Sequence, residues 1–279
     1  MKFSLVLATI DRVSELDRFL KSLDNQTYRD FELILVDQNT DGRLDALVET
    51  YCSHYSLIHI YSALGLARSR NAGLQRISGD VVAFPDDDCW YPGELLGRGA
   101  ALMQNHPDWD GVTGIARSEE GGLSRYHWDG EPGPVTKWNV WKRGVSISIF
   151  LRRRVVEVIG NFDERLGLGA GTPWGSGEET DYLLRAIEMK MEIMYQPNLV
   201  VHHEDSCLGY KAGDVIKGKL YGGGMGFIMR KHHYPIDWVV IELGRPLIIA
   251  LASSITNQWE RSKYFIVVFV GRIIGYFGS

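Results

Sequence analysis

The strongest constraint on the fold is an alternation of short apolar runs with amphipathic segments over residues 3–84. The apolar runs contain few polar residues, which is typical of strands that are buried on both faces of a sheet. The intervening segments place apolar residues at the spacing of an amphipathic helix. This order predicts an α/β fold with a mainly parallel sheet and helices on both faces. The predicted strands are residues 3–9, 31–36, 57–61 and 81–84, and the predicted helices begin near residues 14, 44 and 66.

Polar residues follow three of these strands directly. Thr9 and Asp11 follow the first strand, Asp37 follows the second, and an acidic triplet at 86–88 follows the fourth. The carboxyl ends of parallel strands meet at one edge of a sheet, and ligands of such folds bind beyond that edge. We therefore expect these side chains to gather at one ligand site.

The acidic triplet, Asp86, Asp87 and Asp88, has two interpretations. Aspartate is common in turns because its side chain bonds to the local backbone. However, three carboxylates at the mouth of a buried strand repel one another unless a cation neutralises them. Mg²⁺ and Mn²⁺ prefer oxygen ligands and are often held by one or two carboxylates together with phosphates. A divalent metal site is the hypothesis that this position favours.

Two further segments carry groups with possible chemistry. Glycines lead into a predicted helix whose first turn holds Glu178, Glu179 and Asp181, and these carboxylates either offset the helix dipole or supply a general base. His202 and His203 follow a strand-like run, and such a residue is either structural or a metal ligand. Both alternatives stay open on the sequence alone.

Two nucleotide-binding motifs are missing from the chain. There is no GxxxxGK[ST] motif, and no GxGxxG motif follows the first strand. Phosphate-loop NTPases and ordinary nicotinamide dehydrogenases are therefore disfavoured. A bound nucleotide would have to be held by side chains and a metal.

Charge divides the chain into an acidic body and a basic tail. Residues 1–209 hold 21 Lys and Arg against 31 Asp and Glu, whereas residues 210–279 hold 9 against 4. We expect a catalytic domain at 1–209 and a helical appendage at 210–279. The acidic body argues against nucleic-acid binding, and the basic, apolar tail is compatible with an anionic membrane surface. Charged residues interrupt its apolar runs before they reach the roughly 20 residues of a spanning helix. We therefore expect these segments not to cross a membrane. They either lie on its surface or pack as a helical subdomain.

Seven short segments, in order and over residues 3–205, resemble the family 2 glycosyltransferases, which have the GT-A fold. They are ATIDR at 8–12, LVD at 35–37, RNAG at 70–73, SGD at 78–80, FPDDD at 84–88, GEETD at 177–181 and VHH at 201–203. The tail, with its glycine run at 222–224, looks like the C-terminal region of bacterial members that act on lipid-linked or surface polysaccharides.

The resemblance implies a role for each matching residue. Thr9, Asp11 and Asp37 would face the nucleoside, and Arg70 and Asp80 would lie beside the nucleotide-sugar. Asp86 and Asp88 would form the DxD pair, with Asp88 on the metal and Asp86 on the ribose or near the metal. His203 would add a metal or diphosphate contact, with His202 as the alternative register. Glu179 would be the general base and Glu178 its rival, because this chain has Glu-Glu where the family usually has Glu-Asp.

The leading hypothesis is an inverting, Mn²⁺- or Mg²⁺-dependent transfer of a sugar from a nucleoside-diphosphate sugar, with a UDP-sugar as the expected donor. The acceptor would be a hydroxyl of a glycan or a polyprenyl-linked sugar. The alternatives are a nucleotidyltransferase and a non-catalytic carbohydrate- or nucleotide-binding module. Three widely spaced cysteines and the absence of a secretory signal favour the cytoplasm, including the cytoplasmic face of the membrane.

Overall fold

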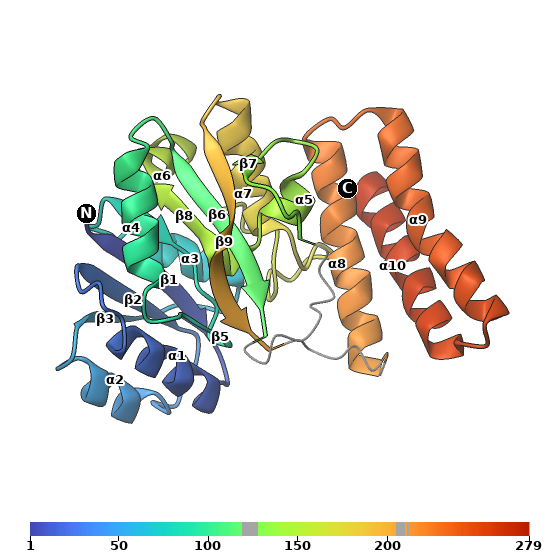
Figure 1. Cartoon of the computed structure of the whole chain (residues 1–279). Coiled ribbons are helices and arrows are strands. Elements are labelled where there is room, and N and C mark those ends of the chain that lie inside the picture. Colours follow the sequence, from blue (N-terminus) through green and yellow to red (C-terminus); the bar gives the residue numbers. More distant parts are fainter. Residues whose placement is uncertain (119–127, 205–209, 211, 279) are drawn as a thin grey trace. The chain divides into compact units, whose positions relative to one another are not determined.

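The computed structural model describes residues 1–118, 128–204, 210 and 212–278 (Figure 1). The chain divides into two compact units. The first comprises residues 1–64, 68–162 and 182–205, and the second comprises residues 65–67, 163–181 and 206–279. The expected domain division at residue 209, which itself lies outside the described residues, stays a prediction.

The first unit is built on a mixed sheet with the strand order β3-β2-β1-β4-β8-β6-β9-β5, and β7 pairs with β9. The elements up to β9 are β1 Phe3–Thr9, α1 Ser14–Asp24, β2 Phe31–Asp37, α2 Asp45–Tyr51, β3 Ser56–Tyr61, α3 Leu66–Leu74, β4 Val81–Ala83, β5 Cys89–Trp90, α4 Leu95–Asn105, β6 Gly111–Arg117, β7 Gly133–Pro134, α5 Val140–Arg143, a 3-10 turn Ser146–Ser148, β8 Ile149–Arg152, α6 Arg153–Ile159, α7 Glu178–Glu188 and β9 Ile193–His203.

The predicted α/β fold is confirmed. Strands β3, β2, β1 and β4 run parallel, and Thr9 is in register with Asp37, so the carboxyl ends of β1 and β2 meet. The second half of the sheet is mixed, because β8 runs antiparallel to both β4 and β6. The parallel half of the sheet therefore presents one edge of strand ends, as the sequence predicts.

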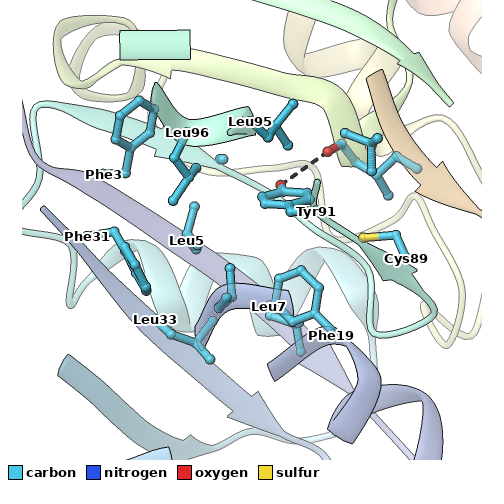
Figure 2. Packing of buried hydrophobic residues seen from close by; sticks show 14 of the residues in the cluster. Phe3, Leu5, Leu7, Phe19, Phe31, Leu33, Cys89, Tyr91, Leu95 and Leu96 are labelled. Carbon is cyan, nitrogen blue, oxygen red and sulfur yellow. Dashed lines mark hydrogen bonds between the residues drawn. The ribbon is translucent and has the colours of Figure 1, made fainter. Parts of the chain in front are cut away.

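Helices cover both faces of this sheet. On one face, alternate residues of β1 and β2 pack with the apolar sides of α1 and α4. Figure 2 shows Tyr91 in this layer, where its hydroxyl donates a hydrogen bond of 3.2 Å to the carbonyl oxygen of Ile147. On the other face α3 lies so close that a Cβ added to Gly73 would come within 2.4 Å of the side chain of Val6. The glycine at 73 is therefore needed for packing of α3 on the sheet.

The helices of the second unit are α8 Ala212–Lys231, α9 Ile236–Ile255 and α10 Trp259–Phe277. The glycines of α8 allow close contacts. A Cβ at Gly222 would lie 2.4 Å from the carbonyl oxygen of Val268 on α10, and one at Gly223 would lie 2.1 Å from that of Pro173. The glycine run at 222–224 therefore lets α8 pack against α10 and against the segment before α7.

Helix α9 bears on the expectation that the apolar segments of the tail do not cross a membrane, which stays a prediction. Among the described residues, α9 is the one helix that is long enough and apolar enough to cross a membrane, by length and composition only. Its mean hydropathy is 1.6. A third of that window is buried inside the protein. The charges that interrupt the apolar run lie within the helix, where Arg245 Nη1 pairs with Glu242 Oε1 at 2.7 Å, so they do not end it.

Candidate functional site

The acidic triplet lies at the carboxyl edge of the parallel strands. Asp86 forms an isolated parallel bridge with Ala8, next to the end of β1. Thr9 Oγ1 donates a hydrogen bond of 2.7 Å to Asp87 Oδ2. Arg12 Nη1 donates to Asp87 Oδ1 at 2.7 Å and also pairs with the carboxylate of Asp88. No role for Arg12 was expected from the sequence, although it lies only three residues after the end of β1.

The neighbours of the triplet shift its protonation. Burial raises the pKa of Asp87 in spite of its bonds to Thr9 and Arg12. Burial also opposes ionisation of Asp88, but the hydrogen bond from His203 and the charge of Arg12 prevail and lower the pKa of Asp88 to about 2. Asp88 is therefore ionised at neutral pH and has a preference for cationic partners.

Strand β5 brings His203 to the triplet. It pairs antiparallel with the end of β9, so that Cys89 is opposite His203. Nε2 of His203 lies 3.4 Å from Asp88 Oδ1, and the hydrogen bond to Asp88 raises the pKa of His203. His202 points elsewhere and stacks on Trp90, with 5.6 Å between ring centroids. Of the two histidine registers, the geometry brings His203 to Asp88.

Asp86 has a different partner. Arg70 Nη2 donates to Asp86 Oδ1 at 3.0 Å and to Ser146 Oγ at 2.5 Å. The side chain of Arg70 is only 1% exposed, and its guanidinium lies 5.6 Å from the ring centroid of Phe162. Burial and these contacts fix Arg70, and Arg70 in turn orients Asp86.

The donor set fits a metal ion that brings further ligands with it. Within the described ranges, no group of three His, Cys, Asp or Glu side chains is arranged to hold a metal on its own. The expected trio of Asp86, Asp88 and His203 is therefore not assembled, because Asp86 is bound to Arg70. Asp88 and His203 do provide an adjacent carboxylate and imidazole, which suit Mn²⁺ when phosphate oxygens complete the shell.

A second polar group follows β2. Asp37 is fully buried, and its carboxylate accepts hydrogen bonds from the backbone and side-chain nitrogens of Asn39, at 2.7 and 2.8 Å. It also lies 3.1 Å from Nε2 of His59. Asn39 Oδ1 accepts a bond of 2.9 Å from the backbone N–H of Asp11, whose side chain is exposed. Asp37 thus supports Asn39, and sequence reasoning missed Asn39 and His59. Asn39 could have been found from its position, because it is a polar residue two positions after the end of β2.

The structure corrects the expectation for Asp80. We expected this residue beside the nucleotide-sugar, but it precedes β4, and its carboxylate accepts a hydrogen bond of 2.8 Å from the backbone N–H of Lys2. Because β1 and β4 are parallel, with Phe3 opposite Val81, Asp80 lies at the amino-terminal edge of these strands. Thr9 and the triplet lie at the other end, so Asp80 is not part of this site.

The first turn of α7 contains the other predicted carboxylates, and residues 163–181 belong to the second unit. Glu178 and Asp181 are buried, whereas Glu179 is half-buried. Asp181 is 2.6 Å from Lys231 Nζ and 2.8 Å from His232 Nε2. Gly177 precedes the turn with a φ of +89°, and a Cβ there would lie 2.3 Å from Ile228, so only glycine fits.

Curated relatives match parts of the chain. The glycosyltransferase AglE of Haloferax volcanii is 24% identical over 183 residues, which cover 61% of this chain and 59% of that protein. A GalNAc(5)-diNAcBac-PP-undecaprenol beta-1,3-glucosyltransferase of Campylobacter jejuni is 33% identical over 109 residues, or 37% of this chain and 34% of that protein. The matches therefore span less than two thirds of these relatives.

Solved structures match nearly the whole chain. The mannosyltransferase PcManGT of Pyrobaculum calidifontis, solved with GDP-Man and Mn²⁺, gives a TM-score of 0.66 at 17% identity over 98% of this chain and 87% of that one. S. aureus TarS 1-349 with UDP-GlcNAc gives a TM-score of 0.62 at 16% identity, over 98% and 91%. These likenesses show a shared fold.

The family itself follows from the sequence profile. The profile described as glycosyl transferase family 2 matches residues 4–157, which is more than half of the chain and includes β1, β2 and the acidic triplet. On this match the chain belongs to glycosyl transferase family 2.

Proposed function

We propose that this protein transfers a sugar from a nucleoside-diphosphate sugar to a hydroxyl group of a glycan or lipid-linked acceptor, with inversion at the anomeric carbon. The observation that carries the proposal is the pairing of Asp88 with His203 at the carboxyl edge of the parallel strands. The pair offers a charged, partly exposed anchor for a metal and a diphosphate where α/β folds bind their ligands.

The donor would lie along this edge. TarS has been solved with UDP-GlcNAc and PcManGT with GDP-Man, which supports a nucleotide-sugar donor, and we expect a UDP-sugar. Asp11 and Asn39, which is held by Asp37, would meet the nucleoside. Thr9 would act indirectly, since its hydroxyl holds Asp87. Arg70 would keep Asp86 oriented toward the ribose or diphosphate.

The metal would be Mn²⁺ or Mg²⁺, held by Asp88 and His203. When bound, such an ion neutralises the charge that develops on the leaving diphosphate. Asp86 would remain near it as an outer carboxylate. Arg12 would have to give up its bond to Asp88 or share it, which its 41% exposed side chain permits.

The proposed general base is Glu179. Inversion by single displacement requires a carboxylate that takes the proton of the attacking hydroxyl. Glu179 occupies the second acidic position of the GEETD segment, and of the three acidic residues in the first turn of α7 it is the least buried. Glu178 is the rival, and its burial favours a role in binding the acceptor or in supporting the turn.

The proposed acceptor and location come from a relative of this chain. The Campylobacter relative is named for an undecaprenol-linked substrate, and lipid-linked acceptors are presented at a membrane. We therefore propose a polyprenyl-linked sugar as the acceptor and the cytoplasmic face of a membrane as the place of reaction.

A hydrolysis screen tests the proposed function. The protein would be incubated with UDP-, GDP- and dTDP-sugars in Mn²⁺ or Mg²⁺, and the products would be separated by chromatography. Slow release of a nucleoside diphosphate, lost on adding EDTA and in the Asp88→Asn variant, is the expected result. Release of pyrophosphate would instead indicate a nucleotidyltransferase, and binding without any turnover would indicate a binding module. Once an acceptor is known, proton NMR of the new linkage reports whether the anomeric configuration is inverted.

A further inference from the structure

The turn that follows β1 fixes where Arg12 points. Asp11, the residue before it, has a φ of +60°, in the left-handed region that is uncommon for residues other than glycine. The backbone N–H of Asp11 donates a hydrogen bond of 2.9 Å to Asn39 Oδ1, and Asn39 is held by the buried carboxylate of Asp37. Residues after β2 therefore hold this turn in the conformation from which Arg12 reaches residues 86–88.

One nitrogen of Arg12 contacts two carboxylates that differ in exposure. Its Nη1 lies 2.7 Å from Asp87 Oδ1 and also pairs with Asp88 Oδ2. The side chain of Asp87 is 10% exposed, and its other oxygen accepts the hydrogen bond from Thr9. The side chain of Asp88 is 28% exposed, and its other oxygen lies near His203. Asp87 is therefore the fixed anchor of Arg12, and Asp88 is the partner that a ligand reaches from solvent.

Arg12 and a metal ion would compete for Asp88. Both are cations, and the guanidinium of Arg12 already contacts Asp88 Oδ2. Two positive charges at one carboxylate repel each other, and the repulsion is stronger at a partly buried site than in bulk water. A guanidinium keeps its proton at any pH near neutral, so this repulsion is not relieved by deprotonation. A metal ion therefore gains full contact with Asp88 only if Arg12 moves.

A diphosphate would supply a new partner for Arg12. Guanidinium groups bind phosphate oxygens through two parallel hydrogen bonds, and the diphosphate of the proposed donor would lie beside Asp88. The side chain of Arg12 is 41% exposed, which leaves it room to turn toward such a ligand. With a diphosphate present, Arg12 exchanges one anionic partner for another. With a metal ion alone, Arg12 loses Asp88 without a replacement.

We propose that Arg12 makes metal binding depend on the nucleotide. In the free protein Arg12 occupies Asp88, and it yields Asp88 to the metal when a diphosphate binds its guanidinium. This inference rests on the proposed function, because it takes Asp88 as a metal ligand and a nucleoside diphosphate as the ligand beside it. It adds a role for Asp87, which retains Arg12 next to the site. Coupling between two ligands is reciprocal, so the metal should strengthen nucleotide binding by the same factor.

Titration with Mn²⁺ tests the proposal, with the unbound ion measured by its electron paramagnetic resonance signal. The wild type and Arg12→Gln would each be titrated without a nucleotide and with UDP. Coupling between two ligands typically corresponds to about 5–150-fold in affinity, so we expect Arg12→Gln to bind Mn²⁺ alone about tenfold more tightly than the wild type. UDP should then tighten Mn²⁺ binding by a smaller factor in Arg12→Gln than in the wild type.

Two matched variants identify the charge of Arg12 as the cause. Arg12→Lys keeps a positive charge at this position and should restore weak binding of Mn²⁺ alone. Arg43→Gln removes a charge at the same edge, from a 36% exposed side chain that pairs with Asp11 and Asp41. It should bind Mn²⁺ alone like the wild type, because exposed charges are screened. Circular dichroism establishes that each variant is folded, and Arg12→Met replaces Arg12→Gln if that variant does not fold.

The proposal is overturned if the folded neutral variant binds Mn²⁺ alone no more tightly than the wild type, or if Arg12→Lys binds it as tightly as the neutral variant. It is also overturned if UDP tightens Mn²⁺ binding equally in the wild type and the neutral variant, or if none of these proteins binds Mn²⁺. Failure of the proposed function gives a different result. The wild type would then hydrolyse no nucleotide-sugar, whereas the effect of Arg12→Gln on Mn²⁺ binding is measured without any sugar donor.

Discussion

The acidic turns of the two units are alike in sequence and differ in how their charge is neutralised. At residues 86–88 of the first unit, Arg12 is 41% exposed and Asp88 is 28% exposed, so the ion pair reaches solvent. At the start of α7, in the second unit, Asp181 is fully buried, and its partners are Lys231, which is 25% exposed, and His232, which is 3% exposed. We propose that the first pair exchanges its cation for a metal. The carboxylate of Asp181 has no exposed surface, so we expect acidic residues at a motif position to be available for chemistry only where the carboxylate itself reaches solvent.

We expect the largest effect at the turn of residues 86–88, whose bound cation we propose to be exchangeable. Asp88→Asn should abolish detectable transfer, because it removes the carboxylate that we assign to the metal, while the unfolding free energy falls by no more than about 2 kcal/mol. Donor hydrolysis and urea unfolding measure the two quantities. If Asp88→Asn keeps wild-type turnover, the metal assignment is wrong.

The next effect concerns the base. Glu179→Gln should slow transfer by about 10²–10⁴-fold, since a general base contributes that much to the rate. Binding of donor and metal should be unchanged, because the amide keeps the shape of the side chain. The matched control is Glu178→Gln. If Glu178→Gln is inactive and Glu179→Gln transfers at the wild-type rate, the general base is Glu178 and not Glu179.

At the other turn, the start of α7, we expect a substitution to lower the free energy of unfolding. Asp181→Asn removes the buried carboxylate that Lys231 and His232 share, and although Lys231 keeps its pair with Asp163, breaking a buried pair in this way costs about 3 kcal/mol. Urea unfolding measures the loss. Arg98→Gln, which breaks an exposed pair with Glu94 on α4, serves as the control and should change stability by less than about 1 kcal/mol. Equal effects of the two substitutions would remove the contrast between the turns.

The smallest effect is a dependence on pH. Burial opposes ionisation of Asp163, but its bonds to Arg165 and to Lys231, at 2.9 Å, prevail and hold its pKa below the ordinary value. A lowered folded pKa means that the stabilisation is present above the unfolded pKa of about 4 and is lost as the pH falls below it. The unfolding free energy should therefore decline less steeply between about pH 5 and pH 3 in Asp163→Asn than in the wild type. Identical slopes would contradict this.

The sequence predicted the parallel half of the fold well because local signals agree there. Apolar runs, helical spacing and polar strand ends all indicated the same order, and the ends of β1 and β2 do meet. Asp80 shows the limit. It belongs to a motif, but only the register of β4 against β1 reveals that it lies at the opposite edge.

Other parts of the site depended on long-range contacts. Arg12 reaches Asp87, and His203 reaches Asp88 through the pairing of β5 with β9. Lys231, the last residue of α8, and His232, which follows it, are about fifty residues from Asp181 along the chain, so no local pattern linked them. The same holds for α9, where Glu242 and Arg245 looked like breaks in the sequence and are paired with each other.

The most direct test of the exchangeable site is a calorimetric titration with Mn²⁺ in the absence and presence of UDP. We expect weak binding to the protein alone, because Asp88 and His203 supply only two ligands and Arg12 is bound to the carboxylate of Asp88. With UDP present, binding should tighten by at least about tenfold as diphosphate oxygens complete the shell, and Asp88→Asn should lose that gain while Asp181→Asn, if folded, keeps it. Mn²⁺ binding that is the same with and without UDP, or that survives in Asp88→Asn, would contradict the account.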